Sequence, residues 1–225
     1  MITISELNKQ EIINDPLWEL GAFKEMLCTL FMANKEITDL VMPVLDDKDF
    51  TFEENWFGGT HEKTINGEHK KVNLQGHCLM TPFIEGVVSS SKTFICMETY
   101  CEKVTAKNIK NLSFQIYIYA HRDSIRISKE EKQKYYGLGY AGNRCDIITM
   151  AINRCLMNEN VKSKFGIGNL AFDNEHRPIG THVPNNNYYG RVLSYIVPDF
   201  YITSKMRREF INAGELWFSD WYYST

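Results

Sequence analysis

Two long segments, residues 93–104 and 113–121, limit what this chain can fold into. Side chains in a β-strand point alternately to two faces, and both segments fit a period of two. In the first, one face would carry Phe94, Cys96, Glu98 and Tyr100, and the other Ile95, Met97, Thr99 and Cys101. In the second, Phe114, Ile116, Ile118 and Ala120 alternate with Gln115, Tyr117, Tyr119 and His121. Enrichment in Thr, Tyr and Ile supports both strands, which we expect to form part of a meander.

Helical periodicity is found on both sides of these strands. Asn143 suits the N-cap of a helix over residues 143–158, whose buried stripe would be Ile147, Ile148, Ala151, Ile152 and Cys155. Near the N-terminus, Asp15-Pro16 is a typical helix opening. The stripe that follows predicts an amphipathic helix of about five turns and consists of Leu17, Leu20, Phe23, Leu27, Leu30 and Phe31. A shorter helical segment is expected at residues 36–45.

Residues 46–76 differ in character from the rest of the chain. They hold much of the local charge, the adjacent glycines Gly58 and Gly59, and the pair Asn66-Gly67. Asn-Gly is a strong signal for a tight turn between two strands. We expect an irregular excursion or a long hairpin that projects from the fold, and insertions of this kind are usually functional or disordered.

The remaining sequence supplies further strands. We expect a first strand at residues 77–84, a connection at 122–141, and strands at 169–173 and 188–201. The last two would be separated by a loop that contains Pro178, Gly180 and Pro184.

Together these elements predict an α+β fold, with a mainly antiparallel β-sheet packed by a long helix. N-terminal helices and the projecting 46–76 segment would be added to it. The predicted organisation is a helical segment at 1–45, the projection at 46–76, an α+β core at 77–202 and an aromatic arm at 203–225.

Composition narrows the class of protein. The chain has 225 residues, a formal net charge of −3 and a pI of about 6.1, whereas a general nucleic-acid binder would show a basic surplus or stripe. No run approaches the roughly 18 apolar residues of a membrane helix, so we expect no membrane partner.

The six cysteines include no CxxC pair, and the polar N-terminus does not resemble a signal peptide. We therefore expect buried thiols in a reducing compartment.

Motifs for chemistry are weak throughout. His77, Cys78, Cys96 and Cys101 lie on neighbouring predicted strands, but Cys96 and Cys101 are five positions apart and would point to opposite faces, which does not suit a zinc site. No GxSxG elbow is present. The run GLGYAGNR before the predicted helix lacks the Lys-Ser/Thr of a phosphate loop. The paired carboxylates at 46–47 and 53–54 lie in a polar segment. We predict no enzyme, no metal and no cofactor.

Aromatic residues make up 13% of the chain, and they either fill a β-rich core or face partner subunits. Candidates for partner contact are Trp56, Phe57, Arg207, Arg208, Trp217, Trp221 and Tyr222. The C-terminal residues among them either dock on their own domain or form an arm that inserts into a neighbour. Two basic pairs are candidates for contact with nucleic acid, Lys162 with Lys164 and Arg207 with Arg208, although such clusters are usually solvated surface.

The half of the chain from residue 77 to 202 carries a resemblance. Its segments, in chain order, are KTFICMETY, SFQIYIYAHRD, GNRCDIITMAINRCL, FGIGNLAF and YYGRVLSYIVPDF. This succession resembles the small neck and tail-completion proteins of tailed bacteriophages, of the tail-terminator type that caps a tail tube and joins it to the head. Residues 1–76 and 203–225 have no counterpart in compact members of that group.

The resemblance implies a non-enzymatic structural protein of the virion, located in the tail or neck and assembled in the host cytoplasm. It implies a homo-oligomer, commonly a hexameric ring, with the sheet around a channel and the helices outside. Partners would be other neck, tail or connector proteins, and DNA would pass through the channel without sequence-specific binding. The alternative is a non-enzymatic protein-binding module or regulator that uses the 46–76 segment for recognition.

Overall fold

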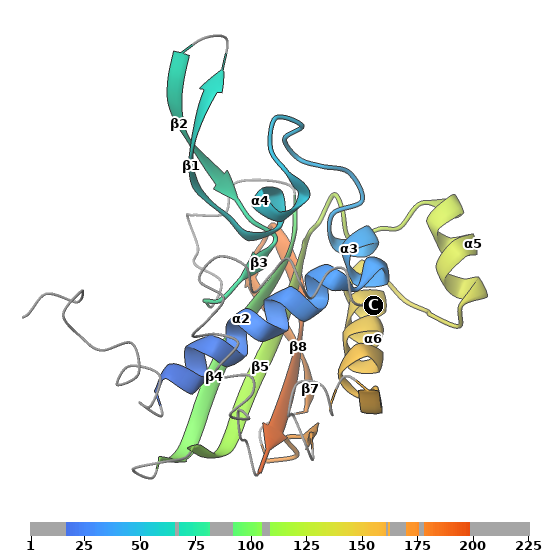
Figure 1. Cartoon of the computed structure of the whole chain (residues 1–225). Coiled ribbons are helices and arrows are strands. Elements are labelled where there is room, and N and C mark those ends of the chain that lie inside the picture. Colours follow the sequence, from blue (N-terminus) through green and yellow to red (C-terminus); the bar gives the residue numbers. More distant parts are fainter. Residues whose placement is uncertain are drawn as a thin grey trace, which may run out of the picture.

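A six-stranded β-sheet carries helices on one of its faces in the computed structural model of the chain (Figure 1). The residues that the structure describes are 17–65, 68–81, 92–104, 109–160, 162, 170–175 and 178–198. The mixture of helices with a largely antiparallel sheet confirms the predicted α+β class.

The helices lie in three parts of the chain, and the helix ends follow from local capping. Their bounds are α2 (Trp18–Ala33), α3 (Lys35–Val41), α4 (Phe52–Phe57), α5 (Lys129–Gly137) and α6 (Arg144–Leu156). The predicted cap of α6 is confirmed, because the Asn143 side chain accepts the Asp146 N–H at 3.1 Å. Asn34 caps α3 in the same way. The predicted helix opening at Asp15-Pro16 lies outside the described residues.

The sheet is built from β3 (Cys78–Leu79), β4 (Thr93–Val104), β5 (Ile109–His121), β6 (Ala171–Phe172), β7 (Ile179–Asn185) and β8 (Tyr188–Val197). The strand order is β3-β4-β5-β8-β6, and β7 also pairs with β8. All pairs are antiparallel except β3 with β4. The predicted strand at 93–104 is confirmed to the residue by β4.

A separate hairpin rises from the sheet and consists of β1 (Gly58–Ile65) and β2 (Glu68–Gln75) (Figure 1). This confirms the hairpin that was predicted within 46–76, while its expected turn at 66–67 lies outside the described residues. The base of the hairpin requires glycine. Gly58 has a φ of 67°, and a Cβ there would lie 2.2 Å from the Gly76 nitrogen.

The main core lies between the sheet and the layer formed by α2, α3 and α6. Figure 1 shows α2 crossing the long strands and α6 running beside them. The Phe23 ring of α2 meets Phe114 of β5 edge-on, with ring centroids 5.0 Å apart. The alternation predicted for β5 is confirmed, because its core-facing residues are all at most 1% exposed: Phe114, Ile116, Ile118 and Ala120.

Four parts of the sequence prediction are corrected by the structure. The connection 122–141 contains α5, which begins at a capping box formed by Ser128 and Glu131. The loop expected before residue 188 contains β7, where Pro184 is tolerated because β7 is an outer strand. Of the strand predicted at 77–84, residues 77–81 are described, and only Cys78–Leu79 form a strand, which pairs in parallel. The 46–76 segment contains α4, which is packed into the core by Trp56 and is not part of the projection.

Candidate functional site

The face of the sheet opposite the helices carries a band of aromatic and polar side chains. Strand register places them together, because Gln115 pairs with Ser194, and Tyr119 pairs with Gly190, which in turn pairs with His182. We call the following residues the aromatic band: Tyr100, Gln115, Tyr117, Tyr119, His182 and Ser194. Antiparallel sheets commonly leave one face toward solvent or a partner, and no described helix covers this face.

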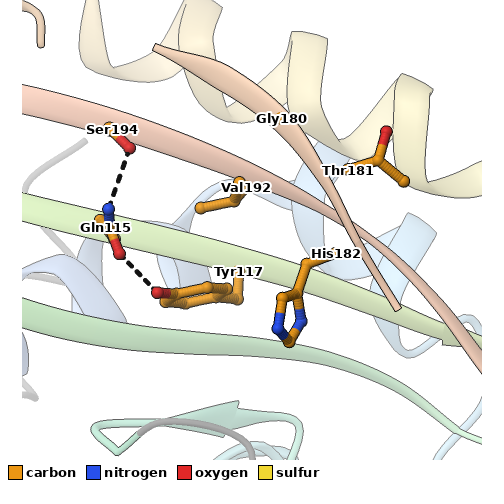
Figure 2. Close-up of a pocket in the computed structure, with 7 residues that line it drawn as sticks. All are labelled: Gln115, Tyr117, Gly180, Thr181, His182, Val192 and Ser194. Carbon is orange, nitrogen blue, oxygen red and sulfur yellow. Dashed lines mark hydrogen bonds between the residues drawn. The ribbon is translucent and has the colours of Figure 1, made fainter. Parts of the chain in front are cut away.

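The Gln115 side chain connects three strands within the band. Its Oε1 accepts a hydrogen bond from the Tyr117 hydroxyl and another from the Tyr100 hydroxyl at 3.4 Å. Its Nε2 donates to Ser194 Oγ at 3.3 Å. Two of these contacts are drawn in Figure 2. A single amide therefore fixes side chains from β4, β5 and β8.

His182 extends the band onto the outer strand β7. Its Nδ1 and the Tyr119 hydroxyl are 2.8 Å apart and share a hydrogen bond. The Tyr117 and Tyr119 rings are stacked with centroids 6.0 Å apart, and the His182 ring meets both edge-on. Gly190 makes this arrangement possible, because a Cβ there would lie 2.5 Å from the Tyr119 ring. The rings of the band therefore have fixed positions, with Tyr119 and Ser194 buried and Tyr100 and His182 exposed.

A shallow cavity of about 290 Å³ opens at the band and is lined in part by it (Figure 2). The side chains that line it come from β5, β7 and β8, and Figure 2 shows Tyr117 and His182 side by side at its edge. The lining residues are Gln115, Tyr117, Gly180, Thr181, His182, Val192 and Ser194. This lining contains no lysine or arginine, so it offers no fixed cation to a phosphate.

Protonation states limit what the band can do. Burial, together with Glu98, raises the pKa of Tyr100, and burial together with Cys96 and Tyr117 raises that of Tyr119. Both phenols therefore stay neutral at physiological pH and act as hydrogen-bonding groups. Neutral tyrosines held in fixed positions are typical of surfaces that bind other macromolecules.

A second group of charges lies where the hairpin joins the sheet. Asp46 Oδ2 is 2.8 Å from His77 Nε2 and also pairs with the Lys92 ammonium. Burial alone would raise the pKa of Asp46, but His77 and Lys92 outweigh it and lower that pKa to about 2. The carboxylate is held by the His77 ring and the Lys92 ammonium, so this group is suited to holding the hairpin base in place.

The cysteines are free thiols, and all but one of the six are buried. Burial raises the pKa of Cys96 to about 12, and burial together with the nearby Asp146 carboxylate raises that of Cys145 to about 12. Cys96 lies on the helix-free face and Cys101 packs against the main core, so the two point to opposite faces as predicted. Among the described residues, no three His, Cys, Asp or Glu side chains gather as they would around a metal ion.

The glycine-rich run before α6 serves as a turn. Gly139 and Gly142 have φ angles of 86° and 103°, which favour glycine. The Asp146 carboxylate accepts the Asn143 N–H at 3.0 Å and pairs with Arg191 at 2.7 Å. A carboxylate thus occupies the N-terminus of α6, where an anion would otherwise bind.

The comparison with protein families gives a match that spans most of these elements. The model of the YomW family matches residues 26–197, from within α2 to the end of β8. The chain belongs to the YomW family. This family is associated with bacteriophage. Searches of curated proteins and of solved structures returned no match.

The part of the chain that matches the YomW family contains part of α2, the other described helices, the hairpin and the whole aromatic band. Residues 203–225 lie beyond it, so the expected C-terminal arm is outside both the match and the described residues. The same holds for Arg207, Arg208, Trp217, Trp221 and Tyr222. No described helix of this YomW-family chain is long and apolar enough to cross a membrane.

The remaining interface candidates occupy different environments. Trp56 has no exposed surface, and its Nε1–H donates to the Cys28 carbonyl at 3.3 Å. A side chain without exposed surface cannot contact a partner, so Trp56 is a core residue. Phe57 is half-buried and packs against the core. Lys162 pairs with Glu159 at 3.0 Å, and Lys164 lies outside the described residues.

Sequence reasoning did not identify the aromatic band as a site. The alternation at 113–121 placed Gln115, Tyr117 and Tyr119 on one face, which was the available signal. His182 was assigned to a loop, because three residues typical of loops surround it: Pro178, Gly180 and Pro184. Its position opposite Tyr119 depends on the pairing of β7 with β8, which the local sequence does not encode.

Proposed function

We propose that this chain is a structural protein of a tailed-phage particle. In this proposal it forms a ring at the tail tube or neck, terminates the tail and joins it to the head. The partners would be further copies of the chain, in a hexameric arrangement, and other neck, tail or connector proteins. Membership of a phage-associated family supports the broader part of this proposal.

The observation that carries the proposal is the two-sided sheet. Helices α2, α3 and α6 cover one face, and the aromatic band occupies the other. In a ring with the helices outside, the band would face the channel. Its cavity lining carries no lysine or arginine, and such a lining would let DNA pass without gripping its phosphates.

Assembly provides the test. Mass photometry and negative-stain images of the full chain, over a range of concentrations, should show ring-shaped oligomers. If the chain is only monomeric at high concentration and in the presence of neck or tail proteins, the proposal fails. A matched control with Lys71→Ala, an exposed hairpin residue whose side chain pairs with Glu62 at 3.0 Å, should assemble like the wild type.

A second candidate function rests on the hairpin. β1 and β2 form a two-stranded sheet apart from the main one, and such a hairpin is marginally stable in isolation. The face with Thr60, Glu62 and Lys71 is polar and exposed. A chain that used it for recognition would be a binding module or regulator.

Most of the hairpin can be removed while every residue of the main core cluster is kept. Gly59 and Leu74 are paired across the strands, so residues 60–73 can be replaced by Asn-Gly, which suits a two-residue turn. Trp56 and Asp46 are retained in this variant. Loss of partner binding with an intact fold would favour the binding module, and unchanged ring formation together with unchanged partner binding would exclude it.

A further inference from the structure

Two strands of the six-stranded sheet, β4 and β7, have an edge that no described strand covers along its full length. At one end of the sheet, β3 pairs with β4 only at Ile95 and Cys96. From Met97 onward, no described strand pairs with the outer side of β4. On the other side, β7 pairs with β8 on one side only. Uncovered strand edges are templates for pairing with another chain.

The direction of the backbone groups on β4 follows from one hydrogen bond. The Ile95 N–H donates to the His77 carbonyl at 2.7 Å, so Ile95 directs its backbone groups outward. In an antiparallel strand, the N–H and C=O of one residue point to the same side, and successive residues alternate. The outward groups on the uncovered stretch therefore belong to Met97, Thr99 and Cys101.

The same reasoning applies to β7. The Ser194 N–H donates to the Pro178 carbonyl at 2.9 Å, so Pro178 directs its carbonyl toward β8. Alternation then places the backbone groups of Ile179 and Thr181 on the outer side. The ladder becomes irregular between His182 and Asn185, so the regular part of this edge is short.

The two edges match in direction and in face. β4, β5, β8 and β7 are successively antiparallel, so β4 and β7 run in opposite directions. Thr99 shares a face with the core residues Ile95 and Met97, and Ile179 pairs with Leu193, which also faces the core. Residues that exchange hydrogen bonds across a ladder must point to the same face. Joining the edges therefore keeps the helices of both copies on one side.

We propose that the β4 edge of one copy pairs antiparallel with the β7 edge of the next copy, so that the sheet continues from copy to copy. This inference rests on the proposed ring, because a contact between two different edges is head-to-tail and can close into a ring. It would also cover side chains exposed in the single chain: Tyr100 at 43%, Ile179 at 53% and Val183 at 57%. Exposed large side chains at a sheet edge are otherwise a liability.

Proline substitutions test each edge separately. Thr99→Pro and Thr181→Pro each remove an outward N–H that no described strand pairs with, which is where strands tolerate proline. We expect each variant to need at least about tenfold more protein for half-assembly, as measured by mass photometry. Thr99→Val and Thr181→Val keep the N–H and should assemble like the wild type. Circular dichroism and thermal melting check the fold of all four.

Mixing the two proline variants gives the decisive readout. Thr99→Pro retains an intact β7 edge and Thr181→Pro an intact β4 edge, so the mixture should form dimers with one copy of each and no rings. Formation of these dimers also shows that both variants are folded. A Thr181→Pro variant that still dimerises by itself would indicate β4 pairing with β4, and would overturn the inference.

The two proposals fail differently. Rings that persist in both proline variants overturn the edge pairing and leave the structural role intact. A wild-type chain that never assembles, alone or with neck and tail proteins, overturns both.

Discussion

His77 Nε2 lies 2.8 Å from Asp46 Oδ2, at the point where the hairpin joins the sheet. The other ring nitrogen, Nδ1, is 2.7 Å from the Thr93 carbonyl, which can only accept. Both partners of the ring are acceptors, so the ring bridges the Thr93 carbonyl and the Asp46 carboxylate. Together with Lys92, it gives that carboxylate two partners.

Asp46→Asn should lower stability in a pH-dependent way. The folded-state pKa of Asp46, about 2, lies below its ordinary value of 3.8, so its stabilisation is present above about pH 4 and is lost as pH falls toward 2. We expect a cost of about 1–2 kcal/mol at pH 7, after allowance for partial exposure. Urea unfolding at several pH values measures it.

A matched control is Asp39→Asn, because Asp39 pairs with Lys35 and Lys134 at the surface. Surface pairs of this kind contribute about 0–1 kcal/mol. If wild type and Asp46→Asn keep the same difference in stability from pH 7 down to pH 2, the account of Asp46 is incorrect.

Arg144 is the next residue whose removal should be costly. Its guanidinium is buried and donates to the Ser124 carbonyl at 2.7 Å and the Leu40 carbonyl at 3.0 Å. It also pairs with Glu131 of α5 at 2.9 Å. Arg144→Ala should cost about 3–5 kcal/mol, because Glu131 would lose its charged partner and two carbonyls their donors. Chemical denaturation measures this, and hydrogen exchange should show α5 opening first.

Arg154 is the comparison for that experiment. It also pairs with a glutamate, Glu36, but its side chain is 59% exposed. Arg154→Ala should therefore cost less than about 1 kcal/mol. Equal losses in the two variants would mean that Arg144 does not connect α3, α5 and α6 as described.

Trp56 should behave as a core residue. Trp56→Ala is expected to cost about 3–5 kcal/mol of stability, because a fully buried ring is replaced by a cavity. Trp56→Phe should cost less, and Phe57→Ala, at a half-buried position, should also be milder. Thermal melts measure the three variants. A Trp56→Ala protein with wild-type stability and impaired assembly would return Trp56 to the interface.

The sequence predicted those parts of the fold that have a local cause. The period of two in 93–104 and the Asn143 cap both act within a few residues, and the structure has them as expected. α5 was missed although Ser128 and Glu131 form its capping box, because its charged sequence has no apolar stripe. β7 was missed because its only strand partner among the described residues is β8, which follows it in the chain. The burial of Trp56 and the assembly of the aromatic band likewise depend on contacts between segments far apart in the sequence.

Gly190 offers a test of the aromatic band that leaves its polar groups unchanged. In Gly190→Ala, the new Cβ would lie 2.5 Å from the Tyr119 ring and 2.9 Å from the His182 carbonyl. Either Tyr119 or β7 must move, so the hydrogen bond between Tyr119 and His182 should be lost at a cost of about 1–3 kcal/mol. Gly137→Ala is the control, because nothing lies within 4 Å of its Cβ in α5, and it should be neutral or slightly stabilising.

If β7 is displaced, ring assembly should weaken as well as stability, since the same strand would carry the proposed contact between copies. A Gly190→Ala protein that keeps both properties would show that the packing of Tyr119 against β7 does not position that edge.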